Sequence, residues 1–154
     1  MSANTRYSPL IGVGVLIWRE HRLLLGKRPL ADGGYCWQFP GGHLEKGEAV
    51  FACAAREVFE ETGLRLSGPR QLGFTDRVFQ AGGHDYLTLM VSADCEAGEP
   101  QLREPDKCLC WQWFDYRQLP SPLFEPIGIF LEAVSAQQSD LYRLHCEAAR
   151  PALP

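Results

Sequence analysis

The distribution of apolar and polar residues along the 154-residue chain predicts several short strands before a helix. Residues 10–19 and 23–25 are rich in Val, Ile and Leu and flank a polar turn, a pattern typical of a hairpin. Residues 35–39 predict a further short strand, after a loop rich in Pro, Asp and Gly at 29–34. This strand is expected to lead the chain into a turn at positions 41 and 42.

Helical spacing begins after these glycines. Glu57, Glu60 and Glu61 stand at positions i, i+3 and i+4, so their carboxylates share one face of a helix. Gly63 stands where a residue in the left-handed conformation commonly ends a helix. The segment therefore predicts an amphipathic helix with an acidic flank. Its expected apolar stripe consists of Phe51, Ala54, Ala55, Val58 and Thr62.

The second half of the chain predicts more strands and two further helices. Residues 71–80 and 85–95 are strand-like and are joined by a short Gly-rich loop, which indicates an antiparallel hairpin. A polar, mobile loop at 96–106 precedes a strand at 109–114. A helix opening at 121, with Pro126 tolerated near its first turn, is expected to cover the sheet. A tail from about 139 is expected to hold a short helix around Leu141 and Leu144 before a frayed, Pro-rich end.

The three glutamates suggest more than a soluble surface. Like charges at i, i+4 cost roughly 0.2–0.5 kcal/mol per pair, and Arg56 offsets only part of this repulsion. A solvated acidic helix is the simpler interpretation, but a hard cation such as Mg²⁺ prefers carboxylate oxygens together with substrate phosphates. Gly41 and Gly42 add to this picture, because glycines let the backbone approach a ligand closely and a helix start attracts phosphate.

The order of these residues is specific. It runs as Gly42, five residues, Glu48, seven residues, Arg56-Glu57, an aliphatic residue, one residue, Glu60-Glu61, one residue, Gly63 and an aliphatic residue. This pattern resembles the Nudix box at every defined position, here spanning 42–64. The resemblance implies one Nudix hydrolase domain over residues 1–154, with an α/β fold in which an α/β/α sandwich contains a mixed central sheet.

The resemblance also implies the chemistry. Nudix hydrolases cleave a nucleoside diphosphate linked to a further group and use Mg²⁺, with Mn²⁺ as a possible substitute. By this resemblance the metal ligands are Glu57, Glu60, Glu61 and the carbonyl of Gly41, and Gly42 lies beside the substrate phosphates. Arg56 and Glu48 are expected to pair and to hold the helix against the glycine turn.

A further carboxylate is expected from the loop before the strand at 109–114. The segment from Glu104 to Cys108 resembles the corresponding loop of MutT-type nucleoside triphosphate pyrophosphohydrolases, where a glutamate approaches the metals from the opposite side. Glu104 is therefore the candidate, as a metal ligand or as the group that accepts a proton from the attacking water. Asp106, Glu99 and Glu96 are the competing choices.

The resemblance favours a (deoxy)nucleoside triphosphate as substrate, with release of monophosphate and pyrophosphate in nucleotide pool sanitation or housekeeping. The first alternative is a Nudix hydrolase of a nucleotide sugar or another nucleoside diphosphate-linked compound. The second is a non-catalytic module that senses nucleotides. Lys27 and Arg28 lie where a substrate phosphate could pass, although two basic residues after a strand also suit a solvated edge. Trp37 and Tyr35 could stack on a base or pack in the core.

Composition narrows the partners. A net charge of −4 and a pI of about 5.5 argue against a broad nucleic-acid-binding surface. The longest apolar run is too short to span a bilayer and no leader-like segment is present, which predicts a cytoplasmic protein without a membrane partner.

The six cysteines, lacking a CxxC pair, are interpreted as reduced and mostly buried, with Cys108 and Cys110 pointing the same way from a strand. His43 and His84 are not expected to bind a hard metal. A homodimer is plausible by resemblance alone.

Overall fold

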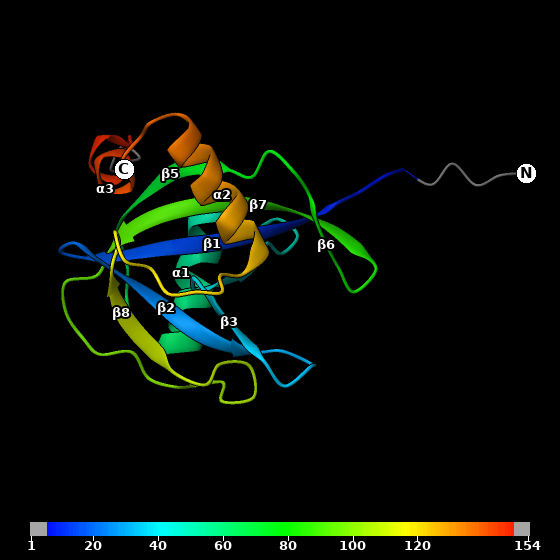
Figure 1. Cartoon of the computed structure of the whole chain (residues 1–154), viewed down its shortest axis with the longest axis horizontal. Helices are drawn as coiled ribbons and strands as arrows, with labels where there is room; N and C mark the ends of the chain where they lie inside the picture. The colour runs from blue at the N-terminus through cyan, green and yellow to red at the C-terminus, as the bar shows by residue number, and fades with distance from the viewer. Residues whose placement is uncertain (1–5, 150–154) are drawn as a thin grey trace, which may run out of the picture.

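The computed structural model describes residues 6–149. A sheet lies between helices, with α1 behind it and α2 in front of it (Figure 1). The strands are β1 (Leu10–Arg19), β2 (Arg22–Pro29), β3 (Tyr35–Gln38), β4 (Gly41–His43), β5 (Ser67–Phe74), β6 (Phe79–Ala81), β7 (His84–Asp94) and β8 (Trp111–Asp115). The helices are α1 (Val50–Thr62), α2 (Glu125–Ala136) and α3 (Leu141–Glu147). This arrangement confirms the predicted sandwich with a mixed sheet.

The sheet is mixed because one pair of strands runs in parallel. The order is β3-β2-β1-β7-β5, in which β1 and β7 are parallel and the other neighbours are antiparallel. In addition, β4 pairs with β1, β6 with β7 and β8 with β2. β1 is therefore the central strand, and its partner β4 carries the Gly41-Gly42 segment, which lies beside Glu57 and Glu61 of α1.

Successive residues of β1 contribute to opposite faces of the sheet, as a two-residue period requires. Leu16 and Trp18 belong to the core beneath α2 and α3, whereas Val15 and Ile17 belong to the core beneath α1. All four side chains are almost fully buried. Because both faces are covered, β1 needs apolar residues at consecutive positions, which explains the run seen in the sequence.

Several predicted boundaries were wrong. The strand expected at 71–80 is split into β5 and β6, which both pair with β7. Thr75 still bonds to Thr88 of β7, and residues 76–78 lie outside the ladder. The Gly41-Gly42 turn is itself the short strand β4. On α1, Cys53 is buried and Ala55 is exposed, since position 53 faces the sheet.

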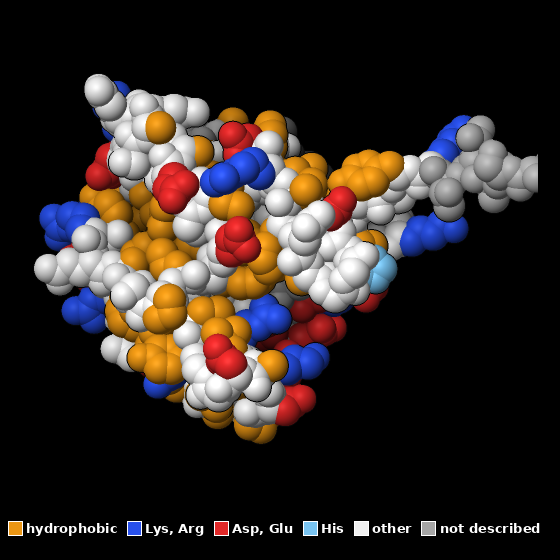
Figure 2. Space-filling view, turned by 45° about the vertical axis from the view of Figure 1, so that its right-hand side comes forward, with side chains coloured by type: hydrophobic (Ala, Val, Ile, Leu, Met, Phe, Trp, Pro, Cys, Tyr) orange, Lys and Arg blue, Asp and Glu red, His pale blue; other side chains and the backbone are white. Residues whose placement is uncertain are grey.

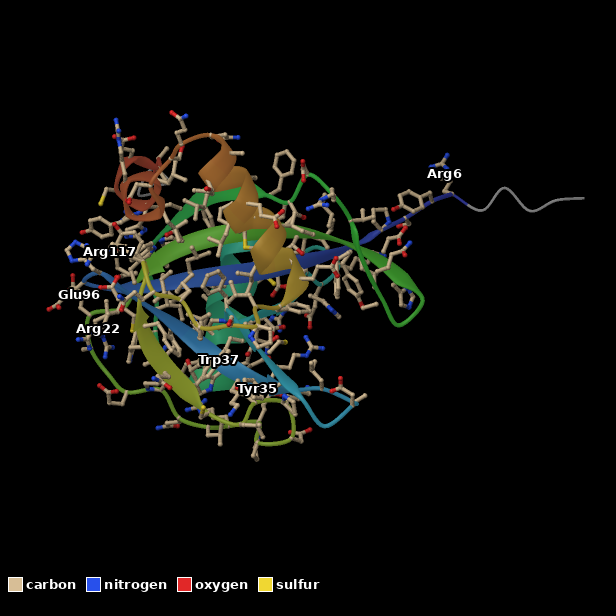
Figure 3. The ribbon with its side chains drawn as sticks, in the orientation of Figure 1. Arg6, Arg22, Tyr35, Trp37, Glu96 and Arg117 are labelled. Carbon is tan, nitrogen blue, oxygen red and sulfur yellow. The ribbon has the colours of Figure 1, made fainter. Side chains whose placement is uncertain are left out.

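The cysteines are free and mostly buried as predicted, but the strand position of two of them was wrong, and the two aromatic residues lie in different environments. All six cysteines are free, and four of them are buried. Cys108 and Cys110 precede β8 and do not lie in a strand, because the chain around them forms a turn and bonds to β2. Trp37 packs in the core, one of the two predicted roles, whereas Tyr35 is exposed; both are labelled in Figure 3. The Lys27 ammonium lies over the Tyr35 ring, 4.0 Å from its centroid.

The structure confirms a helix that carries Pro126 and a short helix around Leu141 and Leu144, but α2 begins at Glu125 and not at 121, because Leu123 pairs with Trp37 of β3. Pro126 lies in the first turn of α2, where its missing N–H costs no helical hydrogen bond. Asp140 caps α3 by accepting a bond from the backbone N–H of Arg143. The last residues of the predicted frayed end, 150–154, lie outside the described residues. None of the helices in the described part of the chain is both long and apolar enough to cross a membrane.

Candidate active site

The acidic face of α1 lines an open cavity of about 860 Å³, which we call the acidic cavity. Six acidic and three basic residues line it, so negative charge is in excess. Figure 2 shows acidic side chains recessed in a hollow, with basic side chains beside them. The acidic residues are Glu45, Glu57, Glu60, Glu61, Glu104 and Asp106, and the basic residues are Arg28, Arg56 and Lys107.

Four of these carboxylates form what we call the acidic cluster: Glu57, Glu60 and Glu61 from α1, and Glu104 from the loop before β8. The loop thus brings Glu104 to the same cavity although it lies more than forty positions further along the chain. The carboxylates are close enough for Glu104 to raise the pKa of both Glu57 and Glu61. The structure therefore brings together the side chains that the resemblance selected.

Arg56 connects the helix to the preceding loop. Its guanidinium donates to Glu48 at 2.7 Å and 2.9 Å, to Glu57 at 2.8 Å and to Glu60 at 3.4 Å. It also donates to the carbonyl oxygen of His43 at 3.3 Å. The bonds to Arg56 hold the pKa of Glu48 down at about 2. The predicted pairing of Arg56 with Glu48 is present, and it draws the start of α1 towards β4.

Glu61 is the most enclosed carboxyl of the acidic cluster. Burial is the main cause that raises its pKa to about 8, with the nearby Glu57 and Glu104 contributing, while the backbone N–H of Gly41 opposes the shift by donating at 3.1 Å. Burial likewise raises the pKa of Glu57, although Arg56 partly opposes this. Burial is therefore the main cause of the raised pKa values of both carboxyl groups, and the neighbouring carboxylates add to it.

At positions 41 and 42, neighbouring atoms lie so close to the backbone that they leave no free space for a Cβ atom. A Cβ atom on Gly42 would lie 2.3–2.5 Å from the carboxyl group of Glu57. A Cβ atom on Gly41 would lie 2.0 Å from the carbonyl oxygen of Val13. A larger residue at position 41 would therefore separate β4 from β1, and one at position 42 would displace the Glu57 carboxyl group from its place.

The donor chemistry fits a hard divalent cation, since the cluster offers only oxygen atoms and is short of positive charge. No three His, Cys, Asp or Glu side chains within residues 6–149 are already arranged to hold a metal ion. The guanidinium of Arg56 lies against Glu57 and Glu60 in this arrangement. Binding of a cation by the cluster would thus require these side chains to reorient.

A second cavity of about 270 Å³ adjoins the first and is mainly apolar; we call it the apolar cavity. Phe79 and Phe124 meet edge to face on its wall, with ring centroids 5.1 Å apart. His43 stacks on Tyr86 at 5.1 Å on another part of the wall. The residues that line both cavities are Arg28, Gln38, Gly41, Gly42 and His43.

The remaining predicted residues divide between these cavities and other surfaces. Arg28 lines both cavities and donates to Gln38 at 3.2 Å, whereas Lys27 lines neither. Of the alternatives to Glu104, Asp106 also lines the acidic cavity. Glu99 instead pairs with Arg19, and Glu96, at the left edge of Figure 3, lines a separate cavity with Arg19.

Sequence reasoning missed several lining residues. Gln38 and Phe79 lay within predicted strands, and Phe124 lay at the start of a predicted helix, but no pattern indicated which way their side chains face. Lys107 follows Glu104 by three residues and bonds to it at 3.2 Å. The spacing of three residues between Glu104 and Lys107 was the sequence signal for this contact, because residues three apart in a turn are neighbours.

Comparison with known proteins identifies the family. Residues 8–134 match the family described as the NUDIX domain. The structure resembles that of a MutT NUDIX hydrolase from Burkholderia pseudomallei, with a TM-score of 0.72 and 35% identity, covering 82% of this chain and 98% of that chain.

Curated relatives carry different names. An ADP-ribose pyrophosphatase of Methanocaldococcus jannaschii is 30% identical over 118 residues, which cover 76% of this chain and 68% of the relative. An NAD-capped RNA hydrolase NudC of Vibrio parahaemolyticus is 30% identical over 125 residues, covering 80% of this chain and 44% of the relative. The chain spans half or less of the length of several other curated relatives. The match over residues 8–134, supported by the glycine turn, the paired Arg56 and the acidic helix, shows that the chain belongs to the Nudix family.

Proposed function

We propose that this protein is a Mg²⁺-dependent hydrolase that cleaves a (deoxy)nucleoside triphosphate to a monophosphate and pyrophosphate. The observation that carries the proposal is the junction of the two cavities. An apolar, aromatic-walled space suits a planar base, and the adjoining acidic space suits a polyphosphate accompanied by cations. The shared residues then lie where the nucleoside meets its first phosphate.

Arg28 is the basic residue best placed at this junction. Its guanidinium lies over the Phe124 ring, 4.8 Å from the centroid, and donates to Gln38. These contacts orient a charge that can bind a phosphate oxygen with two donors. We therefore propose that Arg28 binds a substrate phosphate. Lys27 is not included in the binding site, because its side chain lies over the Tyr35 ring.

The carboxylates of the acidic cluster, with the carbonyl of Gly41, would hold the metal. When bound, Mg²⁺ neutralises phosphate oxygens and makes a water molecule easier to deprotonate. Glu104 lines the same cavity as the glutamates of α1 and is assigned as a ligand or as the acceptor of the proton from the attacking water. Arg56 pairs with Glu48 and bonds to the carbonyl of His43 in β4, which holds α1 next to β4. The role of Arg56 and Glu48 is therefore to position the carboxylates.

A product assay tests the proposal. The protein is incubated with Mg²⁺ or Mn²⁺ and a panel of canonical and oxidised nucleoside triphosphates, nucleotide sugars and ADP-ribose, and the products are separated by chromatography. Monophosphate and pyrophosphate are expected from a triphosphate, and this turnover should be lost in Glu60→Gln. That outcome would also identify the preferred base.

A second candidate is hydrolysis of a nucleoside diphosphate-linked compound, favoured by the relative named ADP-ribose pyrophosphatase. In the same assay, products confined to a sugar phosphate and a nucleoside monophosphate would select this candidate. Nucleotide binding without turnover would instead favour the sensing module. The cytoplasmic location, the single domain, the absence of a nucleic-acid partner and the possible homodimer stay predictions.

A further inference from the structure

The loop that carries Glu104 is attached to the C-terminal end of α1 immediately before that residue. The backbone N–H of Gln101 donates to the carbonyl of Thr62 at 2.9 Å. The guanidinium of Arg103 donates to the carbonyl of Phe59 at 3.0 Å. Both acceptors belong to the last turn of the helix, where a cation is favoured. The Phe59 carbonyl also accepts from the N–H of Gly63 at 2.9 Å, so Arg103 is its second donor.

Arg103 is itself held in place from several sides. Its guanidinium lies over the Phe59 ring, 4.9 Å from the centroid, and donates to the side-chain oxygen of Gln101 at 3.1 Å. A Cβ atom on Gly63 would lie 2.8 Å from the guanidinium. The glycine that ends the helix therefore also leaves the space in which Arg103 binds.

A second attachment follows Glu104. The carbonyl of Glu104 accepts from the N–H groups of Lys107 and Cys108 at 2.9 Å and 3.0 Å. Beyond this turn, Leu109 bonds to the carbonyl of Lys27 in β2. Glu104 thus lies between an attachment to α1 and an attachment to the sheet, and the α1 attachment is adjacent to it.

We infer that Arg103 is a positioning residue, which places the Glu104 carboxylate opposite the glutamates of α1. The inference rests on the proposed function, because the role of Glu104 belongs to it. Arg103 binds the helix turn that carries Glu60 and Glu61, and of the two bonds from the loop to this turn it is the one adjacent to Glu104. Residues that orient metal ligands in this way typically affect metal affinity or activity roughly 10- to 100-fold.

A double-mutant cycle tests whether Arg103 acts through Glu104. Arg103→Ala should lower kcat about tenfold and weaken Mn²⁺ binding in the absence of substrate by a similar factor, with KM little changed. In a Glu104→Gln background the same substitution should have no further effect, since interacting residues are non-additive. Arg103→Lys should restore part of the loss, because it keeps a cationic donor.

Arg65→Ala is the matched control. The Arg65 guanidinium lies over the same Phe59 ring, 4.8 Å from its centroid, but Arg65 does not belong to the loop that carries Glu104. This control should leave kcat and Mn²⁺ affinity unchanged. Equal losses in both variants would overturn the inference, because they would show that packing on Phe59 matters and loop position does not.

Amide hydrogen exchange separates this inference from the proposed function. Arg103→Ala should speed exchange at Lys107 and Cys108, whose N–H groups report the turn at Glu104. Unchanged exchange together with unchanged Mn²⁺ affinity would overturn the positioning role even in an active enzyme. If wild-type protein neither binds Mn²⁺ nor hydrolyses any nucleotide, the proposed function fails first, and the assigned purpose of Arg103 fails with it.

Discussion

Two groups of charged and polar side chains in this protein differ in how their charges are balanced. The acidic cluster faces an open cavity in which acidic residues outnumber basic ones two to one. The other group, which we call the buried network, consists of Arg70, Ser92, Asp94 and His145 and joins α3 to the sheet. Arg70 and Ser92 are almost completely buried there.

The buried network pairs its charges internally. Arg70 donates to Asp94 at 2.7 Å and to the carbonyl of His145. The His145 ring bonds to Ser92 on one side and to Asp94, at 2.9 Å, on the other. Ser92 also accepts from the Trp18 indole at 2.8 Å. A serine, a histidine and an aspartate in a row resemble a hydrolytic triad, but a fully buried serine cannot reach a substrate, so we interpret this row as structural.

The comparison teaches that charge balance separates the two roles. A network with internal partners stabilises the fold, because its buried groups would otherwise be costly. A cluster with excess charge of one sign costs stability and is explained by a ligand that the cluster binds. Substitutions in the first group should therefore change stability, and substitutions in the second should change activity.

The largest effect is expected for Glu60→Gln. Loss of one carboxylate from the acidic cluster should lower kcat by at least about 100-fold, because the charge that stabilises the reacting phosphate is no longer held. The side chain is 55% exposed, so the melting temperature should not fall. Pyrophosphate release and a thermal melt on the same sample check both statements. A fall in melting temperature with unchanged kcat would reverse the assignment of this cluster.

Asp94→Ala should have the converse result. It leaves the Arg70 guanidinium, which is 2% exposed, without its carboxylate partner. The free energy of unfolding should fall by about 2–3 kcal/mol. This is less than for a fully buried pair, because Asp94 is partly exposed. Urea unfolding measures this loss. Turnover by the folded fraction should match that of wild type, and a selective loss of turnover would contradict a purely structural network.

Ser92→Ala is a milder test of the buried network. It removes the acceptor of the Trp18 indole N–H, and a buried donor left without its partner costs roughly 1–3 kcal/mol. Urea unfolding should place this variant between wild type and Asp94→Ala. Undiminished activity would confirm that this serine is not a nucleophile, and complete loss of activity in a stable protein would contradict that interpretation.

The smallest effect concerns acid sensitivity at the edge of the acidic cavity. The Arg56 guanidinium lowers the pKa of Glu48 from 4.5 to about 2, so Glu48 stabilises the fold above about pH 4.5 and loses this contribution as the pH falls towards 2. Glu48→Gln should therefore melt lower than wild type at neutral pH and converge with it at acidic pH. Glu45→Gln is the control, since Glu45 lies 3.8 Å from Arg56 and is largely exposed.

Much of the fold could be predicted from local patterns. The apolar run of β1, the period of α1 and the left-handed Gly63 each depend on neighbouring residues, and the structure confirms them. The division between β5 and β6 was missed, because the place where each strand pairs with β7 depends on residues that are distant along the chain. Local propensity carries no information about such a partner.

By itself, the sequence determined the family and the acidic face of α1, because helical spacing brings Glu57, Glu60 and Glu61 together wherever the helix lies. The tertiary structure decided what faces that helix. It placed Glu104 in the same cavity, tied Arg103 to the carbonyl of Phe59 and joined the acidic cavity to an apolar one. These contacts depend on how a loop and the strands of a sheet pack against one another, and residue spacing along the chain does not specify that packing.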